Sequence, residues 1–88
     1  MAMQEILTRK LREAFEPETL DVIDESEQHR GHGGWREGGE THFRVEMTAT
    51  CFEGMSRVNR QRAVNKVLAE ELSTTVHALA MAIRAPGE

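Results

Sequence analysis

Residues 42–49, HFRVEMTA, decide the fold, because apolar and polar side chains alternate along them without interruption. In an extended chain successive side chains point to opposite faces, so the apolar residues share one face: Phe43, Val45, Met47 and Ala49. The alternation therefore predicts a half-buried β-strand over residues 43–49. His42 is expected on the polar side of it.

A second strand is predicted earlier in the chain at residues 20–23, LDVI, where Val22 and Ile23 are β-branched. The two strands would pair antiparallel across residues 26–43, SEQHRGHGGWREGGETHF, which hold three of the four histidines and five of the seven glycines. This connection is much longer than the usual hairpin loop of about two to five residues. Because glycine loses the most backbone freedom on folding, a bound ligand is one candidate for what makes ordering such a loop worthwhile.

On the N-terminal side, apolar residues recur three and four positions apart over residues 3–15. This spacing predicts an amphipathic helix. Pro17 is expected to end it, because proline disfavours helical geometry in the residue before it.

On the C-terminal side, Ser56 is a helix N-cap, and an apolar stripe predicts a second helix reaching about residue 72. Arg57 and Arg60 project to nearly the same side as that stripe. One explanation is a bend or break near Asn59, with a short leading turn before the main helix; the other is that the arginines line a surface away from the core. We predict the short leading turn followed by the main helix.

A third strand is predicted over residues 76–83, VHALAMAI, and Pro86 with Gly87 would end it. The second helix then crosses over from the middle strand to a strand parallel with it. The order helix, strand, strand, helix, strand predicts an α+β fold in which both helices cover one face of a three-stranded mixed sheet. At 88 residues, the chain has room for a single domain, residues 1–88, with one modest core.

Composition excludes several classes of protein. With 15 acidic against 11 basic residues, the net charge of −4 would repel a phosphate backbone, so nucleic-acid binding needs a local basic patch. The single cysteine, Cys51, excludes an internal disulfide and a self-contained thiolate metal site. No apolar run approaches the roughly 18 residues of a membrane span, and no signal peptide is evident, so we expect a cytoplasmic protein without membrane association.

The histidines are the candidates for chemistry. His77 begins the third strand, and the loop holds His29 and His32. If the fold brings these segments together, two imidazoles from distant parts of the chain can bind one ion. His42 is interpreted as structural. Because no catalytic triad, phosphate loop or paired-carboxylate motif is evident, an enzyme is not expected.

Four stretches, DESEQH, GETHFRV, CFEGMSRVNRQRAV and LAEELSTTVHALA, resemble the BolA family, and specifically its subgroup with a histidine in the loop. The resemblance implies an α-β-β-α-β fold related to the type II KH domain. It also implies binding to a monothiol glutaredoxin, in a heterodimer that shares a glutathione-ligated [2Fe–2S] cluster, with a role in iron–sulfur trafficking or redox regulation. Some members of the family are described as transcriptional regulators in stress response and morphology.

Carried onto this sequence, the resemblance makes His77 one cluster ligand. The second comes from the loop: His29 matches best by its distance from DES, and His32 in the GHG segment is the alternative. The glutaredoxin cysteine and glutathione would complete the site, so no cluster is expected in the isolated chain.

The remaining predictions concern surfaces. Arg57, Arg60 and Trp35 are the candidates for partner binding. The alternative function is DNA binding through a basic set on the second helix: Arg57, Arg60, Arg62 and Lys66. A weak homodimer is left open.

Overall fold

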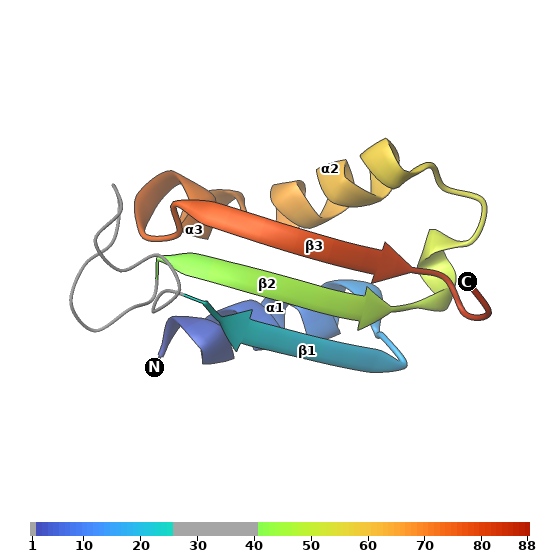
Figure 1. Cartoon of the computed structure of the whole chain (residues 1–88), viewed down its shortest axis with the longest axis horizontal. Helices are drawn as coiled ribbons and strands as arrows, with labels where there is room; N and C mark the ends of the chain where they lie inside the picture. The colour runs from blue at the N-terminus through green and yellow to red at the C-terminus, as the bar shows by residue number, and fades with distance from the viewer. Residues whose placement is uncertain (1, 26–40) are drawn as a thin grey trace.

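The computed structural model describes residues 2–25 and 41–88. Its elements follow the order α1 (Met3–Phe15), β1 (Thr19–Asp24), β2 (His42–Thr48), η2 (Thr50–Phe52), α2 (Arg57–Val67), α3 (Ala69–Thr74) and β3 (Ala78–Arg84). In the sheet, β2 lies in the middle, antiparallel to β1 and parallel to β3 (Figure 1). The predicted α+β fold with a three-stranded mixed sheet is confirmed.

The core lies between the helices and one face of the sheet. Three side chains of β2 are at most 1% exposed and form a single cluster with buried residues of α1 and of the α2–α3 region: Phe43, Val45, Met47, Leu7, Leu11, Val64 and Leu68. Val45 faces Val22 of β1 and Met81 of β3 across the ladder. The alternation in β2 thus arises because one face of the central strand packs against helices.

The predicted break near Asn59 is wrong. The Ser56 Oγ accepts the N–H of Asn59 at 3.2 Å, so a regular helix begins at Arg57. The break lies instead at Leu68, whose φ of −101° and ψ of 17° leave helical geometry and divide α2 from α3. The position of Arg60 does not require a break, because its guanidinium pairs with the carboxylate of Glu88, as described below.

The third strand begins at Ala78, two residues later than predicted. The N–H groups of Thr75 and Val76 both donate to the carbonyl of Glu71, at 3.1 and 2.9 Å. These residues therefore terminate α3 and cannot start a strand. In the described residues, none of the helices is long and apolar enough to span a membrane.

Burial predicts the cost of truncation. Leu68→Ala should lower the free energy of unfolding by about 2–5 kcal/mol, because Leu68 is fully buried where α2 meets α3. Val58, which is 53% exposed on the same helix, provides the control, and Val58→Ala should change stability by less than about 0.5 kcal/mol. Urea unfolding measures both, and equal effects would contradict this packing.

Candidate functional site

His77 lies at the end of the sheet where β3 begins. Its side chain is exposed, and its backbone N–H donates to the carbonyl of Thr41 at 2.7 Å. The same carbonyl accepts the N–H of Ala78 at 3.3 Å. The main chain that carries this imidazole is thereby fixed to the residue just before β2.

The glycine-rich connection begins and ends at the same edge. Before it, Glu25 donates its N–H to the carbonyl of His42 at 2.8 Å and accepts the Nε of Arg44 at 2.9 Å. After it, Thr41 is the residue bonded to His77. Both ends of the connection therefore lie where β2 begins, and the Thr41 end is next to His77.

His29, His32 and Trp35 lie outside the described residues, and the number of residues that separates each histidine from Glu25 and Thr41 sets how far it can reach. Glu25 is two strand spacings from β3, about 10 Å. His29 is four residues beyond Glu25, and four extended residues span about 13 Å. His32 is seven residues beyond Glu25 and nine before Thr41. Chain length therefore allows either imidazole to meet His77 and does not choose between them.

In the structure, the ring beside His77 is that of His42. The rings of His42 and His77 have centroids 6.4 Å apart and planes inclined by 14°. His42 is 8% exposed, and its Nδ1 lies 2.9 Å from the Oγ1 of Thr41, which is fully buried. Sequence reasoning treated His42 as structural and missed this neighbour, because the pairing register of β2 and β3 cannot be read from spacing.

A partly buried ion pair lies next to the turn that leads to His77. The carboxylate of Glu71 in α3 accepts the Nζ of Lys10 in α1 at 2.6 Å, and the Glu71 side chain is 8% exposed. The backbone carbonyl of Glu71 ends α3, as described above. This pair joins residues 61 positions apart and was not predicted. Within residues 2–25 and 41–88, no three His, Cys, Asp or Glu side chains are grouped so as to hold a metal ion.

The predicted contact arginines differ in their surroundings. Arg57 is exposed at the start of α2, whereas the Arg60 side chain is 11% exposed. Arg60 donates to both carboxylate oxygens of Glu88, with Nη2 to Oε2 at 2.7 Å, and to the carbonyl of Ile83 at 3.2 Å. This pairing lowers the pKa of Glu88 to about 2. A role for Arg60 in partner binding stays a prediction, and it would require this ion pair to open.

The two arginines also lie far from His77. The start of α2 lies beside the end of β3, whereas His77 precedes the beginning of that strand (Figure 1). The six steps from Ala78 to Arg84 make β3 about 20 Å long. The remaining basic residues of the set, Arg62 and Lys66, are exposed on α2.

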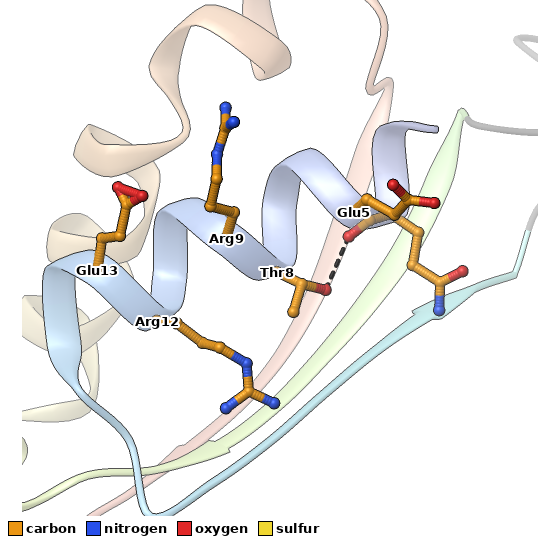
Figure 2. Close-up of a pocket in the computed structure, with 6 residues that line it drawn as sticks. Glu5, Thr8, Arg9, Arg12 and Glu13 are labelled. Carbon is orange, nitrogen blue, oxygen red and sulfur yellow. Dashed lines mark hydrogen bonds between the residues drawn. The ribbon is translucent and has the colours of Figure 1, made fainter. Parts of the chain in front are cut away.

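A shallow hollow follows α1, away from any cluster of histidines. It is lined by residues of this one helix: Gln4, Glu5, Thr8, Arg9, Arg12 and Glu13. Figure 2 shows Arg9 and Arg12 pointing to opposite sides of the helix. Because no polar groups from a second described element converge there, the hollow lacks the character of a ligand site.

The family profile described as BolA-like protein matches residues 11–88. The chain belongs to the BolA-like family. It is 46% identical over 81 residues to the DNA-binding transcriptional regulator BolA of Escherichia coli K12, covering 92% of this chain and 73% of that protein. Two solved structures from Arabidopsis thaliana share the fold. BolA1 has a TM-score of 0.89 and 36% identity, with 100% of this chain and 96% of that chain covered. The BolA domain of SufE1 has a TM-score of 0.87 and 34% identity, with coverage of 98% and 94%.

The Arg60–Glu88 pair predicts a pH dependence of stability. Because the folded-state pKa of Glu88 lies near 2, below the ordinary 4.5, its stabilising effect is complete above about pH 4.5 and is lost as the pH falls toward 2. The difference in unfolding free energy between wild type and Glu88→Gln should therefore narrow over that range. Urea unfolding at several pH values measures it, and a difference independent of pH would contradict the pairing.

Proposed function

We propose that this BolA-like chain is a non-enzymatic adaptor that binds a monothiol glutaredoxin and contributes two imidazoles to a bridging, glutathione-ligated [2Fe–2S] cluster. His77 is one ligand, and His29 or His32 is the other. The observation that supports the proposal is the hydrogen bond from the His77 N–H to the carbonyl of Thr41, because Thr41 directly follows the segment that bears the other two histidines.

The donor set of this chain suits a shared cluster. Cys51 is its only cysteine and lies in η2, beyond the end of β2 that is farthest from His77. Burial raises the pKa of the Cys51 thiol, which reduces the thiolate needed for ligation. Sulfur ligands would therefore come from the glutaredoxin and glutathione. Histidine in place of thiolate raises the potential of Rieske-type centres, and fewer anionic ligands suit a cluster that is passed on.

The proposal predicts that cluster signals depend on both chains and on His77. The glutaredoxin is reconstituted with iron, sulfide and glutathione in the presence of wild type, His77→Ala, His29→Ala or His32→Ala. We expect His77→Ala and one loop variant to change the visible absorption and circular dichroism, because each removes a ligand. The other loop variant should resemble wild type and identifies the histidine that is not used.

Cys51→Ser is the control for general damage, and it should leave the spectra unchanged. Spectra that are identical for wild type and His77→Ala would remove His77 from the site. A full cluster spectrum from this chain without glutaredoxin would contradict the shared-ligand arrangement.

A second candidate function is DNA binding. It is favoured by the 46% identity to an E. coli protein named as a DNA-binding transcriptional regulator and by the exposed basic residues of α2. Arg57, Arg62 and Lys66 are available there, whereas Arg60 is paired with Glu88. Because the net charge of −4 opposes binding to a phosphate backbone, such binding would need a local basic surface, and α2 offers one.

If α2 binds duplex DNA, affinity should fall steeply with salt. Arg57→Ala and Arg62→Ala should each reduce the slope of log K against log salt by about 1, because each removes one phosphate contact. Arg12→Ala removes an exposed charge from α1 and should leave the slope unchanged. Fluorescence anisotropy measures these slopes, and equal slopes for all four proteins would exclude α2 as the DNA-binding surface.

A further inference from the structure

The side chain of His77 lies beside a buried neighbour, His42. His77 itself is exposed, so its ring can exchange among several staggered rotamers unless a neighbour restricts it. Fixing a mobile side chain on metal binding costs free energy, because its rotamer freedom is lost. The cost is smaller for a side chain that is already held in place. The orientation of this ring therefore bears on how well it can ligate a metal.

His42 has the properties of a support. Its residue is 8% exposed, and its Nδ1 is 2.9 Å from the Oγ1 of Thr41. Thr41 is fully buried and also accepts the N–H of His77 through its carbonyl. The two residues thus hold His77 from two sides: Thr41 fixes its main chain, and His42 presents a ring to its side chain.

The ring contact has the geometry of an attractive aromatic pair. The centroid separation of 6.4 Å is within the range of about 4.5–7 Å in which aromatic rings interact, and the near-parallel planes are those of a stacked pair. Because β2 and β3 pair in parallel with His42 opposite Ala78, the backbone holds the two rings at this spacing.

We propose that His42 is a positioning residue that orients the imidazole of His77 for metal ligation through ring contact, without itself ligating. The purpose of this orientation rests on the proposed function, but the orientation is a property of the chain alone. Residues around metal ligands commonly fix ligand orientation, usually through hydrogen bonds, and here the contact is between rings.

Two substitutions separate the ring from the hydrogen bond. His42→Asn keeps a polar group near the Thr41 hydroxyl and removes the ring, whereas His42→Phe keeps a ring and removes the polar group. In the isolated chain, NMR relaxation of the His77 ring should give an order parameter of about 0.8 in wild type and His42→Phe, and below about 0.6 in His42→Asn. An order parameter below about 0.6 in wild type would overturn the proposal without any variant. An order parameter of the His77 ring that stays at about 0.8 in His42→Asn, or that falls below about 0.6 in His42→Phe, would also overturn the proposal.

A second measurement separates positioning from ligation. With glutaredoxin, iron, sulfide and glutathione, His42→Phe should keep the circular dichroism of the wild-type cluster, whereas His42→Asn should lose intensity. Loss in both variants would make His42 a ligand and overturn the positioning role. If His77→Ala leaves the cluster spectrum unchanged, the proposed function fails, while the order parameters of the isolated chain still decide whether His42 orients His77.

Discussion

The hydrogen bond from the His77 N–H to the Thr41 carbonyl is the interaction on which the arrangement of the site depends. It joins the start of β3 to the residue where the glycine-rich connection ends. The parallel ladder of β2 and β3 begins directly after it, and the exposed imidazole lies at the end of the sheet where both strands start. This register fixes where His77 lies relative to Thr41, the described residue that follows the segment bearing His29 and His32.

Local patterns were sufficient for the fold. The alternation in residues 42–49 reflects a central strand with one face against helices, and the spacing over residues 3–15 reflects a helix with Leu7 and Leu11 buried. The Ser56 cap is confirmed by its bond to Asn59. Each of these signals arises from neighbours in the sequence, so each could be read without knowing the tertiary structure.

The features that were missed depend on partners far apart in the chain. Arg60 looked misplaced on the apolar side of its helix because its partner, Glu88, is 28 residues away. The contact of His42 with His77 depends on strand register, and the pair Lys10–Glu71 depends on how α1 packs near α3. The choice between His29 and His32 is not made by sequence or by chain reach, because both lie in the same long connection.

The central claim is that two imidazoles of this chain bind one shared cluster. The most direct measurement is pulsed EPR of the one-electron-reduced complex, prepared with this chain labelled with ¹⁵N-histidine and the glutaredoxin unlabelled. The account predicts hyperfine couplings from two ¹⁵N nuclei, one of which disappears in His77→Ala. A reduced cluster bridging the two proteins with no ¹⁵N coupling would contradict it.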